Sequence, residues 1–262
     1  MTIITHIGEL VGIVPEGVLR KQGAEMDEVG SLRDAYLTIE GERISGFGNM
    51  SECPVPGPQD EVIDAKGGMV MPAFCDSHTH ICYAGTREQE FIDKINGLSY
   101  EEIAARGGGI LNSADLLHRT SEEELYSQTM ARVREMIAKG TGAIEIKSGY
   151  GLTLEDELKM LRVIRRVKKD SPATIKATFL GAHAVGRAFK GRQNEYVNLV
   201  CEEMIPAVAA EGLAEYVDVF CDEGFFTVAE TDRILSAGEA YGLIPKIHAN
   251  ELACSGGAQV AV

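Results

Sequence analysis

Two histidines separated by a single residue are the part of this sequence that most clearly suggests chemistry. His78 and His80 follow the apolar string MVMPAFC. Alternate residues of an extended strand point to the same side, so both imidazoles can approach one ion together. His248, at the end of a later apolar string, can supply a third nitrogen. Three nitrogen ligands with an open position are typical of catalytic zinc, so we predict a metal site at these residues. The alternative is that the histidines are exposed and have no ligand role.

Residues at the ends of other apolar strings are candidates for contact with a substrate. Arg87 follows the histidine pair and presents a planar guanidinium suited to a carboxylate, although most arginines are surface residues. Tyr150, in the glycine-flanked string SGYGL, can donate its hydroxyl to a substrate or pack as a loop aromatic. His183, in GAHAV, is a fourth metal ligand, a donor to an oxyanion or a core histidine. Glu251 can orient a substrate or transfer a proton.

These candidates lie where the strands of a repeating β/α pattern end. We predict strands near residues 68–75, 142–147, 175–182, 215–221 and 243–248, and helices at 99–106, 121–139, 153–169, 195–210 and after Thr227. A (β/α)8 TIM barrel gathers the carboxyl ends of its strands at one face, where its active sites lie. A doubly wound sheet is the alternative, but the string GYG does not match the G-x-G-x-x-G turn of such folds. We therefore predict an α/β fold with a TIM barrel.

The first part of the chain has a different pattern. Residues 1–66 form short alternating segments with turn signals, including a hairpin over residues 35–48, and predict a small N-terminal β-sandwich module. Residues 67–262 contain about five of the eight strands of a barrel. We therefore expect an incomplete barrel, and expect the chain to be an N-terminal portion of a longer protein.

Composition excludes several classes of partner. The formal net charge is −15, from 25 basic and 40 acidic residues, which disfavours binding to nucleic acid or to an acidic membrane. A small anionic substrate would need a local cation, and Arg87 can provide it. The first 20 residues do not resemble a signal peptide, and the 6 cysteines show no C-x-x-C spacing, so we expect a cytoplasmic protein with reduced thiols. A homodimer is an open alternative to a monomer.

Six strings, in order, carry a resemblance to a known family. They are CYAGTREQEF, GGGI, EIKSGYGLTLEDELKMLR, TFLGAHAV, YVDVFCDEGFF and KIHANE. With the preceding PAFCDSHTH they resemble the imidazolonepropionase family of the amidohydrolase superfamily. This resemblance implies a metal-dependent hydrolase that opens the ring of 4-imidazolone-5-propanoate to give N-formimidoyl-L-glutamate in histidine degradation. It also implies one zinc or iron ion at the three histidines, substrate contacts at Arg87, Tyr150, His183 and Glu251, and catalytic roles for His183 and Glu251.

The resemblance leaves some points open. The family supplies an aspartate metal ligand and a further histidine from later barrel strands, and we expect both to fall after Val262. The predicted fourth strand ends in FCDEG, without the lysine that bridges two metals in related barrels, so we expect a single ion. Asn250 stands where the family more often has aspartate. The alternatives are another cyclic amide or amidine hydrolase, a deaminase of the same superfamily, or a non-catalytic truncated fragment.

Overall fold

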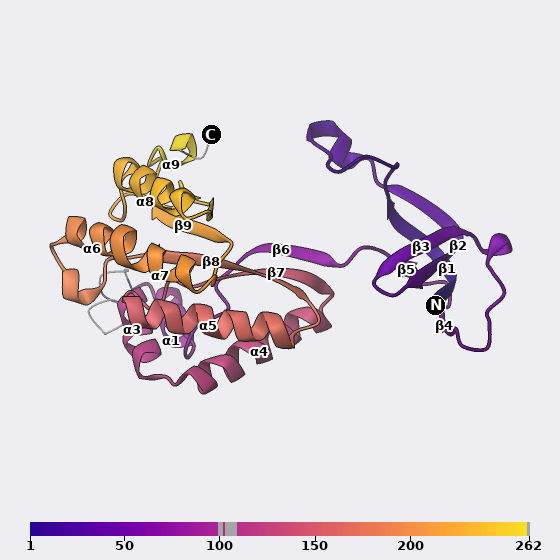
Figure 1. Ribbon diagram of the computed structural model, residues 1–262, viewed down its shortest axis with the longest axis horizontal. Coiled ribbons are helices and arrows are strands. Elements are labelled where there is room, and N and C mark those ends of the chain that lie inside the picture. The colour runs from indigo at the N-terminus through magenta and orange to yellow at the C-terminus, as the bar shows by residue number, and fades with distance from the viewer. Residues whose placement is uncertain (99–101, 103–108, 261–262) are drawn as a thin grey trace. The chain divides into compact units, whose positions relative to one another are not determined.

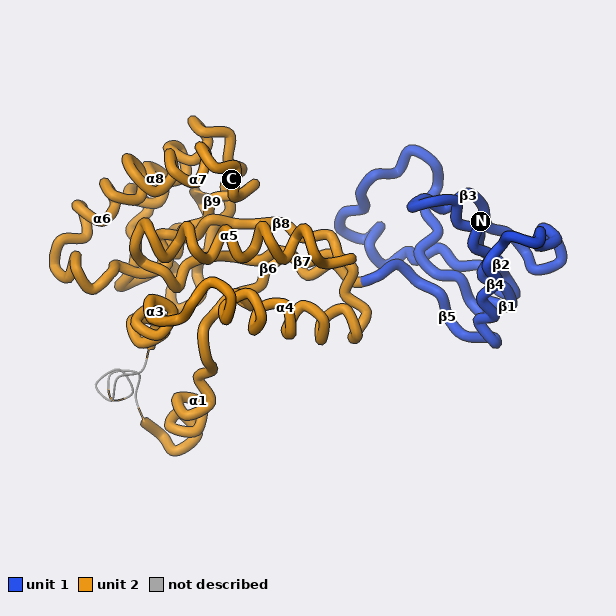
Figure 2. The backbone as a smooth tube through the Cα atoms, turned by 60° about the horizontal axis from the view of Figure 1, so that its bottom comes forward, with its two compact units in different colours: residues 1–73 blue, residues 74–262 orange. Residues whose placement is uncertain are grey.

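The chain separates into two compact units, residues 1–73 and 74–262 (Figure 2). The computed structural model describes residues 1–98, 102 and 109–260. The helix predicted over residues 99–106 lies outside the described residues, apart from residue 102. The boundary predicted at residues 66 and 67 lies a few residues before the division between the two units.

The first unit is a mixed β-sheet. Its strands are β1 (Thr2–Ile13), β2 (Gly30–Glu40), β3 (Arg43–Asn49), β4 (Glu61–Asp64) and β5 (Met69–Val70). They lie in the order β3-β2-β1-β4, and β5 also pairs with β1. The predicted hairpin is confirmed, because β2 and β3 pair in antiparallel register from Glu40 and Arg43 onward. Alternate residues of β1 and β2 point inward and form a small apolar core with Ile7, Leu10 and Leu37.

The strand predicted over residues 68–75 is wrong in its extent. The segment forms two strands that belong to different units, β5, paired with β1, and β6 (Phe74–Thr79), paired with β7 (Thr141–Lys147). Pro72 lies between them, and a proline cannot donate to a strand ladder, which explains the interruption. The first barrel strand therefore contains His78 and ends one residue before His80.

The second unit is a half barrel of parallel strands with helical connections (Figure 1). After β6 and β7 come β8 (Thr174–Ala182), β9 (Tyr216–Cys221), β10 (Ile244–Pro245) and β11 (His248–Ala249). The sheet order is β10-β9-β8-β7-β6, and β11 continues along β9 beyond β10. The strands predicted near 142–147, 175–182 and 215–221 are confirmed, and the one near 243–248 is divided into β10 and β11. β6 and β10/β11 form the two edges of this sheet.

Helices follow the strands of the second unit along the chain, and several of them form a layer against the sheet. They are α1 (Glu88–Ile95), α3 (Ile110–Arg119), α4 (Glu122–Ala138), α5 (Leu154–Asp170), α6 (Gln193–Leu199), α7 (Ile205–Ala210), α8 (Val228–Ala240) and α9 (Gly257–Val260). α4 packs on β7, α5 on β8 and α8 on β9. Buried side chains such as Val133, Ile164 and Ile234 fill the space between the two layers. Each contributes about 1.5–3 kcal/mol by leaving water.

Local capping explains where the predicted helices begin. Ser121, Thr153 and Thr227 are the N-caps of α4, α5 and α8, and each hydroxyl accepts a hydrogen bond from a backbone N–H three residues later. The helix predicted over residues 195–210 is instead α6, a π-helical turn (Val200–Met204) and α7. Pro206, in the first turn of α7, lacks the N–H that a continuous α-helix would use, so the ladder widens before it. No helix in the described part of the chain is long and apolar enough to cross a bilayer.

Candidate metal centre and substrate pocket

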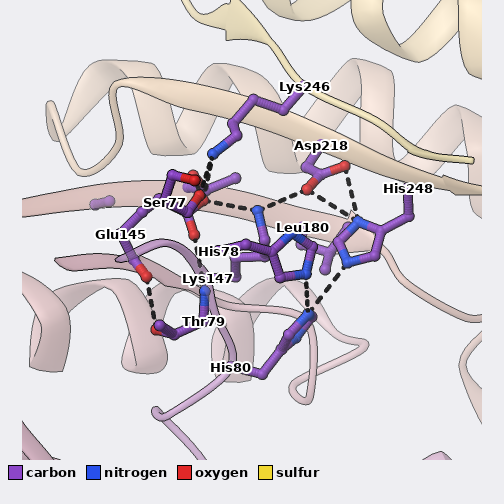
Figure 3. A network of polar contacts seen from close by, with 12 residues as sticks. Ser77, His78, Thr79, His80, Glu145, Lys147, Leu180, Asp218, Lys246 and His248 are labelled. Atoms are coloured by element: carbon purple, nitrogen blue, oxygen red, sulfur yellow. Dashed lines mark hydrogen bonds and ion pairs between the residues drawn. The ribbon is translucent and has the colours of Figure 1, made fainter. Parts of the chain in front are cut away.

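The three histidines predicted as ligands meet across the open face of the half barrel. His78 lies in β6, His80 follows it, and His248 begins β11 at the opposite edge of the sheet. His80 Nε2 lies 3.3 Å from Nε2 of His78 and 3.1 Å from Nε2 of His248. Among the described residues, these three form a group whose ligand atoms all lie within 4.8 Å of one another. Figure 3 shows their rings turned toward one another.

The donor set fits a tetrahedral metal ion. With Zn–N bonds of about 2.0–2.1 Å, two ligand nitrogens of a tetrahedron are separated by about 3.3–3.4 Å, close to the two contacts made by His80. His80 Nε2 carries at most one proton, so as a neutral ring it cannot donate to both neighbouring nitrogens. Burial, followed by the neighbouring histidines, lowers the pKa of His80 to about 3, and burial also lowers the pKa of His78. Neutral imidazoles with converging lone pairs are the state that a metal ion requires.

Asp218, a residue of β9, orients His248, the third histidine of the group. The carboxylate of Asp218 is 1% exposed and lies 3.1 and 3.0 Å, through its two oxygens, from His248 Nδ1. A carboxylate can only accept a hydrogen bond, so Nδ1 of His248 carries the proton. Nε2 of the neutral ring therefore has a lone pair, which faces His80. Burial alone would raise the pKa of Asp218, but the hydrogen bond from His248 and the charge of Lys147 bring it down to about 2. The carboxylate is therefore ionised whenever the site is used.

His183 lies beside this group and is held by the loop after β7. Its Nδ1 lies 2.9 Å from the carbonyl oxygen of Gly149, and its ring stacks on His80 with centroids 5.2 Å apart. A carbonyl can only accept, so Nδ1 carries the proton and Nε2 is an acceptor in the neutral ring. Burial lowers the pKa of His183 to about 4, which favours this neutral form. Gly149 has φ of 110°, and a Cβ there would lie 3.0 Å from His183 Nδ1, so glycine permits the contact.

A buried glutamate shapes the loop that carries Tyr150. Glu157, in the first turn of α5, accepts hydrogen bonds from the backbone N–H groups of Gly149, Gly151 and Leu152 at 3.0, 2.7 and 2.9 Å. Its side chain is fully buried, and burial raises its pKa against the effect of these donors. The loop directs Tyr150 toward the histidines, with ring centroids 5.3 Å from His183.

Arg87 and Tyr150 line one pocket together with His80. The pocket has a volume of about 360 Å³, and its other lining residues are Tyr83, Gly85 and Ser113. The guanidinium of Arg87 pairs with Glu90, whose other oxygen accepts the backbone N–H of Gly109 at 3.0 Å. The Tyr83 ring is stacked under Arg132, with 3.5 Å between the guanidinium carbon and the ring centroid. The pocket thus places a cation and two phenol side chains next to the histidine group.

Glu251 lies on the loop after β11, and its side chain is exposed. The buried carboxylate of Asp222, at the end of β9, fixes this loop by accepting the backbone N–H groups of Glu251, Leu252 and Ala253 at 2.7, 2.8 and 3.1 Å. Asn250 adopts φ of 57°, a left-handed conformation that asparagine tolerates better than most residues. The role of Glu251 in binding or proton transfer stays a prediction.

Sequence reasoning missed two of the carboxylates that position the candidate residues. Asp218 holds His248, and Glu157 shapes the Tyr150 loop. Tyr83, in the pocket, was also missed. Two weak signals existed, since Asp218 alternates with apolar residues inside a strand and Glu157 interrupts the apolar face of a helix.

The sequence of the chain is similar along its length to those of proteins named imidazolonepropionase. It is 52% identical over 261 residues to an imidazolonepropionase from Flavobacterium psychrophilum, and 51% identical over 260 residues to one from Christiangramia forsetii. The alignments cover 100% and 99% of this chain. The chain is a homologue of the imidazolonepropionases. It spans 63% of the length of these two relatives. An amidohydrolase family model also matches residues 61–105.

Solved structures of low sequence identity show the same fold. A 5-methylcytosine deaminase from Klebsiella pneumoniae superposes with a TM-score of 0.66 at 15% identity, over 98% of this chain and 54% of that one. An atrazine chlorohydrolase from Arthrobacter aurescens, solved with zinc, superposes with a TM-score of 0.55 at 11% identity, over 96% of this chain and 53% of that one. The chain therefore shares its fold, a parallel half barrel preceded by a β module, with part of these two structures.

Proposed function

We propose that this protein contributes to the hydrolytic opening of the ring of 4-imidazolone-5-propanoate, which yields N-formimidoyl-L-glutamate. The observation that carries the proposal is the placement of three converging imidazole nitrogens next to a pocket that contains Arg87 and Tyr150. The substrate after which the related enzymes are named combines a cyclic amide with a propanoate. The histidine group can act on the ring, and Arg87 can bind the propanoate.

Arg87 is the group proposed to bind the propanoate. A guanidinium can hold a carboxylate through two parallel hydrogen bonds. Glu90 holds the guanidinium at the pocket, so its orientation is set before the substrate arrives. Burial raises the pKa of Tyr150, which keeps its hydroxyl protonated and available as a donor. Tyr83, on the same pocket, offers a second hydroxyl.

The metal ion would be held by His78, His80 and His248. When bound, zinc or iron supplies a Lewis acid for the ring carbonyl and lowers the pKa of a coordinated water. His183 Nε2 enters as a hydrogen-bond acceptor, because Nδ1 donates to Gly149. It gains the oxyanion-donor role expected from the sequence only after it takes up a proton. Glu251 is the proposed second group for proton transfer and substrate orientation.

The proposal is tested by measuring metal content and product formation in the same preparation. The protein, loaded with zinc or iron, is incubated with 4-imidazolone-5-propanoate and with a hydantoin, and products are followed by mass spectrometry. About one ion per chain, with N-formimidoyl-L-glutamate formed from the first substrate alone, would support the proposal. Equal turnover of the hydantoin would instead support another cyclic amide hydrolase. A bound ion without turnover of either substrate would support a non-catalytic fragment, in keeping with the 63% coverage of the relatives.

A further inference from the structure

The interior beneath the histidine group is charged, where a barrel normally has branched apolar side chains. Four side chains, Glu145, Lys147, Asp218 and Lys246, form what we call the interior clasp (Figure 3). Lys147, Asp218 and Glu145 are 0, 1 and 5% exposed. Burying charges is costly unless they are paired, so this arrangement calls for an explanation beyond filling the core.

The contacts within the clasp join the two edges of the sheet. Lys147 Nζ donates to Glu145 Oε1 at 2.7 Å and to Asp218 Oδ2 at 2.8 Å. Lys246, which follows β10, has its Nζ 3.3 Å from Glu145 Oε1 and donates to the backbone carbonyl of Ser77 in β6 at 2.9 Å. The clasp therefore contains two ammonium groups and two carboxylates and is balanced in charge. Bonds between such ionised groups are short and strong.

Each carboxylate of the clasp also holds a segment that carries metal ligands. Asp218 accepts from Nδ1 of His248. Glu145 fixes Thr79, the residue between the other two histidines. The Thr79 hydroxyl donates to the backbone carbonyl of Glu145 at 2.6 Å, and the Thr79 N–H donates to the Glu145 carboxylate at 3.3 Å. One ammonium, that of Lys147, is bonded to both carboxylates.

We infer that Lys147 is a positioning residue that sets the separation of the two ligand-bearing edges. Through Glu145 it locates the strand of His78 and His80, and through Asp218 it locates His248. These edges are four strands apart in sheet order, and yet Nε2 of His80 and Nε2 of His248 lie 3.1 Å from each other. The inference rests on the proposed function in one respect, namely that the three histidines hold an ion.

The test uses a charge-balanced variant, because Lys147→Met alone would remove the ammonium that two buried carboxylates share and leave an excess of negative charge. In Lys147→Met/Glu145→Gln one positive and one negative charge are removed together. We expect its affinity for Zn²⁺, measured by competition with a chelating dye, to fall about 10–100-fold, as is typical for loss of an outer-shell partner. We also expect the visible spectrum of bound Co²⁺ to change, since it reports ligand geometry. The matched control is Lys139→Met/Glu135→Gln, an exposed pair 2.6 Å apart on α4 and its C-cap, which should retain the parent affinity.

The outcomes separate this inference from the proposed function. If the parent protein binds neither Zn²⁺ nor iron, the proposed function fails. If the parent binds Zn²⁺ and the clasp variant keeps both its affinity and its Co²⁺ spectrum, Lys147 only fills the interior and the inference is overturned. Should the double variant fail to fold by circular dichroism, Lys246→Met decides, because that side chain is 26% exposed. Weaker Zn²⁺ binding by Lys246→Met supports the clasp, and parental affinity refutes it.

Discussion

Replacing His80 by alanine removes the imidazole that both close Nε2 contacts share. His80 Nε2 lies 3.3 Å from His78 Nε2 and 3.1 Å from His248 Nε2, so the variant loses the central ligand and leaves two nitrogens at opposite edges of the sheet. Four-ligand structural zinc sites bind with about 10–16 kcal/mol, so one ligand contributes roughly 3 kcal/mol. That corresponds to a loss of affinity on the order of 100-fold.

The same substitution should affect the metal-free protein little. His80 Nδ1 is buried and has no hydrogen-bond partner among the described residues, so truncating the side chain breaks no hydrogen bond at that nitrogen. We therefore expect His80→Ala to keep the thermal midpoint of the metal-free protein within a few degrees, while the rise in midpoint on adding Zn²⁺ shrinks. Calorimetric titration with Zn²⁺ measures the affinity directly, and differential scanning calorimetry measures the midpoints.

The matched control is His6→Ala in the first unit, where the histidine is 61% exposed and pairs with Asp64 at 3.1 Å. It removes the same chemical group from a place with no ligand role. An affinity of His80→Ala within about threefold of the parent, or an equal loss in His6→Ala, would refute the metal site, because a difference of this size is under 1 kcal/mol.

Three further predictions concern the pocket, the acid stability and the thiols. Arg87→Met should weaken binding of a propanoate-bearing substrate about 10–100-fold, since a charged hydrogen bond is lost, as steady-state kinetics or competition by a propanoate analogue will show. Burial acts to raise the pKa of Asp156, but the hydrogen bonds from Lys159 and His118 together have a larger effect, so that the pKa lies below its usual value. Its stabilisation is present above the unfolded pKa and lost as pH falls through the folded pKa, so Asp156→Asn should flatten the fall of the thermal midpoint below about pH 4. Burial raises the pKa of Cys82 to about 12, so a thiol reagent at pH 8 should label the exposed Cys75 and leave Cys82 unmodified until unfolding, as peptide mass spectrometry will show.

Much of the fold was predictable because its signals are local. Capping residues such as Ser121 and Thr153 mark helix starts within a single turn, and apolar strings between them mark buried parallel strands. The errors arose where one local signal interrupted another. Pro72 divided a continuous apolar string between two units, and Pro206 widened a helix into a π turn.

The sequence was sufficient to identify the three histidines of the candidate site. The H-x-H spacing, with a third histidine at the end of a later strand, identified the group that the structure brings together. The roles proposed for Arg87, Tyr150, His183 and Glu251 remain to be tested. For His183, the bond to Gly149 makes Nε2 an acceptor in the neutral ring, which no sequence pattern indicates.

The sequence by itself determined which chemical groups are available, in which order, and on which strand ends, because strand and helix periodicity depend on neighbouring residues. Only the tertiary structure decided which of the 40 acidic residues are buried and what each one holds. Asp218 meets Lys147 from 71 positions away, and His80 meets His248 from 168 positions away. The sheet must curve before such groups can touch. An aspartate on the surface and an aspartate that orients a candidate metal ligand look the same in a sequence. They differ in how far the carboxylate is removed from water and in its distance from the histidine.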